Sequence, residues 1–386
     1  MLAPITNTPR DYDWGSTNLL ADLEGRPASG QPEAEIWFGD HPGCPARVAD
    51  GRPLGDWLRD EGAGTGAPER LPYLLKLLAA ASPLSIQAHP SRAQAIEGFA
   101  REEAAGIPRD AGTRTYRDDN HKPELIVAIS DEFTALAGLR DLDTTQRLLA
   151  ELGPAGDDLA ARLSGPDAAS ALRDTIQWLL SGDSSATVDD VVAAAARTRS
   201  DAFAAEFALV GRLAATNPGD PGIVVALLMN LVTLRRGEGV YVPAGVLHAY
   251  LEGLGVELMA ASDNVLRGGL TPKHIDVDEL VAVLDATPGP APVVRAESRS
   301  GGVFVYPTPA PDFALTRVEV ADADVALALT GVAIAVATAG EVTLRGAAGE
   351  PVSLRPGQAV LITPDERPVA AGRGELFVAQ PGVSGS

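Results

Sequence analysis

The sequence predicts a mainly β protein with a helical insert, and three features of the chain support this fold class. Residues 1 to 140, and again residues from about 230 onward, contain short β-like runs separated by Gly/Pro turns. Residues 141 to 222 are instead rich in Ala and Leu, with apolar residues at helical spacing. From residue 296 to 386, strand-like runs recur about every ten residues, as in a sandwich or barrel.

These changes of composition predict three domains. We expect residues 1–140 together with 223–290 to form the main domain, and residues 141–222 to form a small α-helical domain inserted into it. A Pro-rich linker at 287–292 indicates a boundary, so that residues 291–386 would form a C-terminal β domain. The helical insert contains no cluster of ligand-type residues, which favours a packing role or a wall over a cleft.

Two helix starts can be predicted from capping patterns. Ser91, directly after His89 and Pro90, has Gln94 three residues later and should cap a helix. Thr187 with Asp190 resembles a second capping box inside the helical insert.

The most apolar segment, residues 325–339, is short for a membrane span. Its large and small residues alternate, which predicts a strand with the large side chains on one face. The large residues are Val332, Ile334 and Val336, and the small ones are Ala333, Ala335 and Ala337. No membrane partner is therefore expected.

The charge of the chain excludes several classes of protein. With 31 basic and 52 acidic residues the net charge is −21, which argues against nucleic acid as a partner. The one cysteine, Cys44, cannot form an internal disulfide, and the first residues lack the pattern of a secretory signal. We expect a cytoplasmic, monomeric protein. Only three of the basic residues are lysines (Lys76, Lys122 and Lys273), so at each of them we ask why arginine, with its different donor geometry and inability to lose a proton, does not serve.

Potential metal ligands occur at three places. Gln87 and His89 lie two residues apart at a predicted strand end and should face the same side. In the string His121–Glu124, the same alternation places Lys122 and Glu124 on one side and His121 on the other. A bound metal ion would disfavour the ammonium form of Lys122, which could then exchange a proton near neutral pH.

The third place, residues 237–248, fits the pattern G-x5-P-x-G-x2-H and resembles the second motif of cupins, in which the histidine binds a metal at the mouth of a small barrel. The first cupin motif is present in altered form, with Gln87 in place of its first histidine and Glu124 far along the chain. Gln87, His89, Glu124 and His248 form a nitrogen and oxygen ligand set that suits zinc, with cobalt, manganese or nickel as substitutes. His41 and His274 are more simply explained as structural histidines.

Arg267 and Lys273 flank a Gly-Gly loop and could bind a phosphate. An ordinary surface loop with ion pairs explains the spacing about equally well. Lys76 lies between leucines, which favours a paired or edge-facing lysine.

Seven strings, in order along residues 12–273, resemble the type I mannose-6-phosphate isomerase family. The strings are YDWGS (12–16), AEIWFG followed by HP (34–42), LPYLLKL (71–77), PLSIQAHP (83–90), DNHKPE (119–124), VPAGVLHAY (242–250) and ASDNVLRGGLTPK (261–273). The fourth, fifth and seventh of these strings are together highly specific for the family. The helical insert and the C-terminal part carry little of this signature.

The resemblance implies a jelly-roll, cupin-like catalytic domain that interconverts mannose 6-phosphate and fructose 6-phosphate through a cis-enediol. It implies one zinc ion bound by Gln87, His89, Glu124 and His248, with Arg267 as a catalytic residue. Candidates for ring opening and proton transfer are Lys122, His121, Glu257 and Asp263, and the sequence does not decide among them. Candidate contacts to the sugar phosphate are Ser85, Lys273 and Trp14.

Residues 340–344 and 355–364 resemble a second, degenerate cupin copy without histidine, which predicts a structural role for the C-terminal domain. Two rival functions remain at this point. An iron-dependent cupin oxygenase would usually have more histidines and no phosphate clamp. A non-catalytic sugar-binding cupin would not need so many polar groups around a metal.

Overall fold

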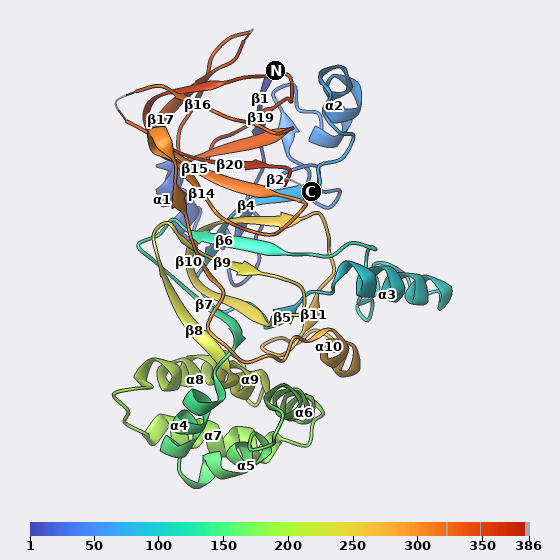
Figure 1. Ribbon diagram of the computed structural model, residues 1–386, viewed down its shortest axis with the longest axis vertical. Helices are drawn as coiled ribbons and strands as arrows, with labels where there is room; N and C mark the ends of the chain where they lie inside the picture. Colours follow the sequence, from blue (N-terminus) through green and yellow to red (C-terminus); the bar gives the residue numbers. More distant parts are fainter. Residues whose placement is uncertain (322, 348, 383–386) are drawn as a thin grey trace.

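The computed structural model describes residues 1–321, 323–347 and 349–382. Figure 1 shows a layer of helices at one end of the molecule, a sheet in the middle and a second sheet at the other end, near both chain termini. The predicted fold class, mainly β with a helical insert, is confirmed. Among the described residues, none of the helices is both long and apolar enough to cross a membrane.

The sheet nearest the termini, here called the C-terminal sheet, has ten strands. In spatial order its main path is β13 (Glu297–Ser298), β14 (Val303–Val305), β15 (Ala314–Val320), β20 (Val369–Gln380), β17 (Ala333–Arg345), β19 (Ala359–Ile362), β1 (Leu2–Thr6) and β3 (Arg47–Val48). Two short strands, β16 (Val325–Ala326) and β18 (Val352–Leu354), pair with β20 and β17. The first strand of the chain therefore lies in this sheet, antiparallel to β19, with Leu2 opposite Ile362.

The middle sheet, here called the central sheet, also has ten strands. Its main path is β11 (Leu266–Arg267), β5 (Gln87–Ala88), β10 (His248–Ala260), β6 (Glu124–Ala128), β9 (Glu238–Val242) and β12 (Val293–Arg295). The others are β2 (Glu35–Phe38), β4 (Tyr73–Ala80), β7 (Glu132–Leu139) and β8 (Met229–Arg235). The long strand β10 pairs with β4, β5, β6 and β7, so it connects most of this sheet.

Helices α4 to α9 form the layer at the far end (Figure 1). Their bounds are α4 (Leu142–Glu151), α5 (Pro154–Arg162), α6 (Ala168–Leu180), α7 (Ser185–Arg197), α8 (Ala204–Thr216) and α9 (Gly222–Leu228). The remaining helical segments are α1 (Leu19–Glu24), α2 (Leu54–Asp60), η1 (Gly62–Thr65), α3 (Arg92–Ala104), α10 (Val277–Val283) and η2 (Ser300–Gly302).

The two capping predictions had different outcomes. The box at Ser91 and Gln94 is confirmed, with both reciprocal hydrogen bonds at the start of α3. The box at Thr187 is wrong, because α7 starts earlier, after Ser184, and Thr187 lies within its first turn. The hydroxyl of Ser184 donates to the carbonyl of Leu179, so the short turn after α6 determines where the next helix begins.

The predicted alternation before and along β17 is confirmed, and both faces are buried. Val332, Ile334 and Val336 belong to a core shared by the two sheets, which also contains Leu75 and Val256 of the central sheet. Ala333, Ala335 and Ala337 belong to a separate core inside the C-terminal part. The large residues thus attach the C-terminal sheet to the central sheet, and the alanines allow its other face to pack closely.

Strand pairing crosses the predicted domain boundary near residue 290 in two places. β1 and β3, from the start of the chain, pair within the C-terminal sheet. β12, just after the Pro-rich segment, pairs with β9 in the central sheet. The division of the chain at residue 290 stays a prediction.

Candidate metal centre

Three buried side chains from different strands or strand ends converge at one point of the central sheet. His89 directly follows β5, Glu124 opens β6 and His248 opens β10. One ligand atom of each lies within 4.8 Å of the others, and the Nε2 atoms of the two histidines are 3.1 and 3.2 Å from the two oxygens of Glu124. These three belong to the ligand set predicted from the sequence.

Both imidazole rings are oriented by backbone carbonyls. Nδ1 of His89 lies 2.7 Å from the carbonyl oxygen of Asn264, and Nδ1 of His248 lies 3.2 Å from that of Val246. Each carbonyl requires a proton on Nδ1, which leaves the lone pair of the neutral ring on Nε2, facing Glu124. Metal-binding histidines are oriented in this way.

The charge states of the cluster also fit a divalent cation. Burial, with a contribution from Lys122, lowers the pKa of His89 to about 4, so the ring is neutral at pH 7. Burial pushes the pKa of Glu124 upward, but Lys122 and the two histidines outweigh it and hold this pKa well below its usual range. Nε2 of His89 is buried and makes no hydrogen bond to any described residue. The neutral imidazole of His89 and the ionised carboxylate of Glu124 can thus bind a metal without first losing protons.

Gln87, the fourth predicted ligand, is placed by strand pairing. It lies opposite His248 of β10 on one side and opposite Arg267 of β11 on the other. Side chains directly opposite each other on antiparallel strands share a face, so Gln87 lies beside the cluster. Its Nε2 donates to Ser85 at 3.1 Å, which leaves the amide oxygen available for a cation.

Lys122 and His121 point to opposite sides, as the alternation in the sequence predicts. Nζ of Lys122 lies 3.0 Å from Oε1 of Glu124, and both side chains line a polar cavity of about 80 Å³. His121 is not among the described residues that line this cavity. Its Nε2 lies 2.6 Å from a carboxylate oxygen of Asp312, in the C-terminal part of the chain.

A second charged group lies on the same cavity. Nζ of Lys76 is 2.8 Å from Glu257 and 3.4 Å from Glu35, and all three side chains are buried. Burial raises the pKa of Glu257 against the opposing effect of Lys76. The interpretation of Lys76 as a paired lysine is confirmed, but its place beside the metal cluster was not predicted. Its only signal in the sequence was the rarity of lysine.

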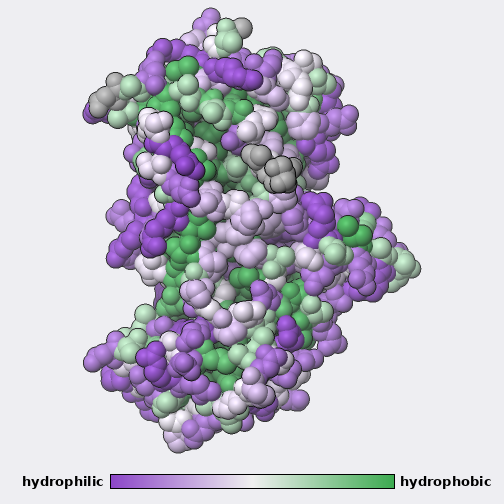
Figure 2. Space-filling view, viewed as in Figure 1, coloured by the Kyte–Doolittle hydropathy of each residue, from purple (hydrophilic) through white to green (hydrophobic). Residues whose placement is uncertain are grey.

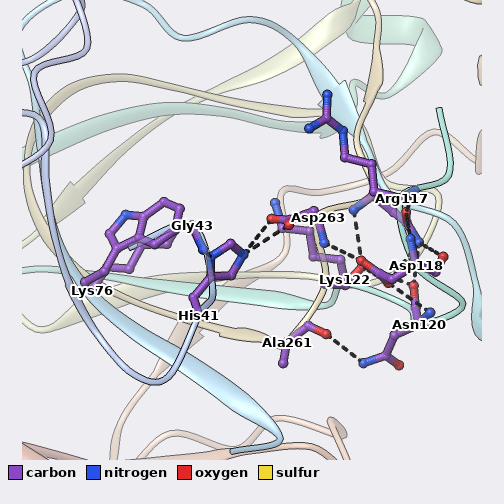
Figure 3. A network of polar contacts seen from close by, with 12 residues as sticks. His41, Gly43, Lys76, Arg117, Asp118, Asn120, Lys122, Ala261 and Asp263 are labelled. Atoms are coloured by element: carbon purple, nitrogen blue, oxygen red, sulfur yellow. Dashed lines mark hydrogen bonds and ion pairs between the residues drawn. The ribbon is translucent and has the colours of Figure 1, made fainter. Parts of the chain in front are cut away.

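Asp263 lies at the edge of a neighbouring cavity of about 310 Å³. Nε2 of His41 is 3.0 Å from both oxygens of this carboxylate, and the N–H of Gly43 donates to Nδ1 of His41 (Figure 3). Since Nδ1 accepts, Nε2 carries the proton and donates to Asp263. Burial alone would raise the pKa of Asp263, but His41 and, more weakly, Lys122 lower it. The carboxylate is therefore ionised and fixed in orientation.

Asn264 connects the segments that carry these groups, and sequence reasoning missed it. It is fully buried, and its side-chain oxygen accepts from the N–H groups of Arg117 and Asp118. Its side-chain nitrogen donates to the carbonyls of Asp118 and Asn120, while its own carbonyl orients His89. Figure 3 shows Asp118 and Asn120 at the centre of this network. In the sequence, the only sign of Asn264 is that it follows Asp263 in the string at residues 261–273.

Arg267 and Lys273 have no carboxylate within ion-pairing distance in the part of the chain that the structure describes. Burial, and to a smaller extent Arg117, lowers the pKa of Arg267, and burial, Arg267 and Arg117 lower that of Lys273. Three cations thus influence one another, and Arg117 also interacts electrostatically with the carboxylate of Asp263. Arg117 was not predicted, because it lies outside the Gly-Gly string.

The Gly-Gly loop between Arg267 and Lys273 packs closely against the start of α9. A Cβ atom on Gly269, whose φ is 121°, would lie 2.4 Å from the Cα of Gly222 at the start of α9. The glycines are therefore needed for close contact between the loop and the helical layer.

Trp14 stacks on Tyr12, with 5.6 Å between ring centroids, and packs against an apolar cluster that includes Tyr250. Trp14 is absent from the described lining of the polar cavity. Tyr250, which no sequence pattern singled out, donates its hydroxyl proton to Glu124 at 3.2 Å.

Comparison with known proteins agrees with this geometry. Residues 2–142 match the family model of the phosphomannose isomerase type I catalytic domain. Mannose-6-phosphate isomerase of Salmonella typhimurium is 36% identical over 388 residues, covering 96% of this chain and 97% of that protein. The chain belongs to the type I phosphomannose isomerase family. The human mannose-6-phosphate isomerase is 30% identical, with 81% of each protein covered.

Solved structures of this family have the same fold. A zinc-bound crystal structure of mannose 6-phosphate isomerase matches 99% of this chain and 100% of its own, with a TM-score of 0.89 and 35% identity. A variant of the Salmonella typhimurium enzyme matches with a TM-score of 0.90 and 34% identity. The predicted family is confirmed, and so is the predicted cupin-like, mainly β fold with helical parts.

Proposed function

We propose that the protein interconverts D-mannose 6-phosphate and D-fructose 6-phosphate with one zinc ion bound by Gln87, His89, Glu124 and His248. The convergence of two carbonyl-oriented imidazoles on one buried carboxylate carries this proposal. The family, and the zinc named with a related structure, support it. When bound, zinc supplies Lewis-acid polarisation of the sugar oxygens.

The reaction requires one proton to move between two carbons of the open-chain sugar. A base removes the proton from C2, and the C–H electron pair forms a C1–C2 double bond while charge develops on O1. The C1–C2 double bond then takes up that proton at C1, O2 gives up its hydroxyl proton as the C2 carbonyl forms, and O1 takes up a proton to become a hydroxyl. The protein must therefore provide a base next to the metal cluster and a cation for the enediolate oxygen.

Lys122 and Glu257 are the best placed of the four proton-transfer candidates, since both line the polar cavity. Glu257 has a raised pKa, which brings a carboxyl group closer to the pH at which it can exchange protons. Asp263, held by His41 at the neighbouring cavity, is suited to ring opening. His121 faces Asp312 and would contribute indirectly.

Substrate phosphate would bind at the cluster of Arg267, Lys273 and Arg117. Arg267 adjoins Gln87 in the strand ladder, so it can reach an anion beside the metal cluster and stabilise enediolate charge. Lys273 and Arg117 would bind the phosphate, and Ser85 would contact the sugar near Gln87. We assign Trp14 a supporting contact through its stack with Tyr12. This local positive charge would attract a dianion despite the net charge of −21.

Fructose 6-phosphate formation from mannose 6-phosphate, followed by a coupled assay, tests the activity. We expect turnover in zinc-loaded protein, loss after chelation and recovery when zinc is restored. Metal analysis should give one zinc per chain. Absence of turnover in protein shown to contain zinc would contradict the isomerase function and favour a sugar-binding cupin.

We further propose a cytoplasmic monomer with a main domain of residues 1–140 and 223–290, a helical domain of 141–222 and a C-terminal domain of 291–386. Figure 2 shows hydrophilic residues over most of the visible face. Met1 and Ile96 are the large hydrophobic side chains exposed among the described residues, which supports a single chain in solution. Light scattering coupled to size exclusion measures this directly, and a dimer mass would contradict it.

A further inference from the structure

Asp312 is a buried carboxylate of the C-terminal part that contacts the segments of two metal-ligand candidates. It lies between β14 and β15 and is 8% exposed. Oδ2 is 2.6 Å from Nε2 of His121, and Oδ1 is 3.2 Å from a guanidinium nitrogen of Arg92. His121 precedes Glu124 by three residues and Arg92 follows His89 by three. One side chain therefore joins both ligand-bearing segments.

The two contacts of Asp312 differ in strength. The side chain of Arg92 is 54% exposed, so its ion pair is screened by water and contributes little. The side chains of His121 and Asp312 are 17% and 8% exposed, and their distance is that of a short charge-assisted hydrogen bond. The position of Asp312 is itself fixed, because the next residue, Phe313, is fully buried in the core between the two sheets. His121 is thus the main connection to the site.

The direction of His121 determines that of Lys122. Successive side chains of an extended segment point to opposite sides, so a His121 held toward Asp312 turns Lys122 toward the cavity. Glu124 does not depend on this contact to the same degree, because β6 is paired on both sides and Tyr250 also binds the carboxylate. Loss of the contact would therefore affect Lys122 first.

We propose that Asp312 is a positioning residue of the isomerase, by which the histidine-free C-terminal domain holds Lys122 in the active site through His121. This inference rests on the proposed function, since it concerns the turnover of the same site. It gives the C-terminal domain a part in the reaction beyond packing.

The test compares Asp312→Ala with Arg92→Ala in the zinc-loaded enzyme. Asp312→Ala removes both contacts, whereas Arg92→Ala removes the exposed ion pair and leaves His121 bound. We expect kcat to fall about 10- to 100-fold in Asp312→Ala, with KM and zinc content within about twofold of wild type. Arg92→Ala should keep wild-type kcat. Equal losses in the two variants would overturn the proposal, because they would indicate a general loosening of the interface.

A double variant shows whether Asp312 acts through His121. If it does, Asp312→Ala combined with His121→Ala should have the same kcat as His121→Ala alone. Independent, multiplying losses would overturn the proposal. Asp312→Asn, which keeps a hydrogen-bond acceptor, should recover part of kcat and also serves if the alanine variant folds poorly. Asp324→Asn, at an exposed ion pair with Arg345 elsewhere in the C-terminal part, is the matched control.

Different results would contradict the isomerase function and the positioning role of Asp312. A wild-type enzyme without isomerase activity would remove the proposed function. An active wild type with an equally active Asp312→Ala would remove only the positioning role.

Discussion

Replacing Glu124 with Gln should weaken both the stability of the metal-free protein and its response to zinc. The carboxylate is 3% exposed and lies 3.0 Å from Nζ of Lys122, whose side chain is 10% exposed. Gln keeps the size of the side chain but leaves the ammonium group without a counter-charge. Breaking a buried ion pair from one side costs about 3–5 kcal/mol. Because Gln can still form hydrogen bonds at this position, we expect a loss of stability at the lower end of this range, about 3 kcal/mol.

The zinc response gives a second magnitude. Loss of one charged ligand should weaken binding at least about 10- to 100-fold, which is about 1.4–2.8 kcal/mol less stabilisation at saturating zinc. Urea unfolding with chelator and with added zinc, followed by far-UV circular dichroism, measures both quantities. Glu252→Gln, at an exposed ion pair with Arg212, is the control and should change stability by less than about 1 kcal/mol. If Glu124→Gln gained as much stability from zinc as the wild type, Glu124 would not be a ligand.

Three further predictions concern pH, proton transfer and packing. Burial lowers the pKa of His89 to about 4, whereas an unfolded chain takes up this proton near pH 6.5. The free energy of unfolding of the metal-free protein should therefore fall by about 3 kcal/mol as the pH drops from 6.5 to 4, and His89→Gln should flatten the slope in urea titrations across this range. Lys122→Arg should lower kcat about 100-fold in the coupled assay, because arginine keeps its proton; full activity would exclude proton exchange at this residue. Gly98→Ala should destabilise the protein by about 1–3 kcal/mol, since the new Cβ would lie 2.4 Å from the ring of Tyr116. Gly211 lies in α8 with open space around it, so Gly211→Ala should instead stabilise the protein by about 0.4–1 kcal/mol. Thermal melts measure both changes, and stability changes of the same sign in the two variants would contradict the packing argument.

The metal cluster could be predicted because its signals are local. Strand alternation placed Lys122 and Glu124 on one side, and motif spacing selected His248 without knowledge of the fold. The capping box at Ser91 was equally local. The one at Thr187 failed because the turn after α6, and not the side chain, determined the start of α7.

Residues that position the site could not be predicted, because their partners are distant along the chain. Asn264 orients His89 from 175 residues away, and Asp312 contacts His121 across 191 residues. An isolated Asp or Asn carries no sign of its partner. Arg117 becomes a candidate only because the fold brings it close enough to Arg267 and Lys273 to affect their pKa values.

Which strands pair with each other could not be predicted either, because the partners are distant along the chain. A sequence pattern can indicate a strand, but it does not identify the strand that pairs with β1. The structure places it against β19.

The pairing of β1 with β19 also affects when this part of the sheet can form during synthesis of the chain. Leu2 leaves the ribosome before its partner Ile362, which lies 360 positions later in the chain. At roughly 5–20 residues per second, β1 would wait about 20–70 s for β19. During that interval Ile5, which is buried in the finished protein, can pair with Val48 of β3 but lacks its other neighbour, Ala359 of β19. The place of β1 between β3 and β19 can therefore be completed only after β19 has been made, however early β1 and β3 are available.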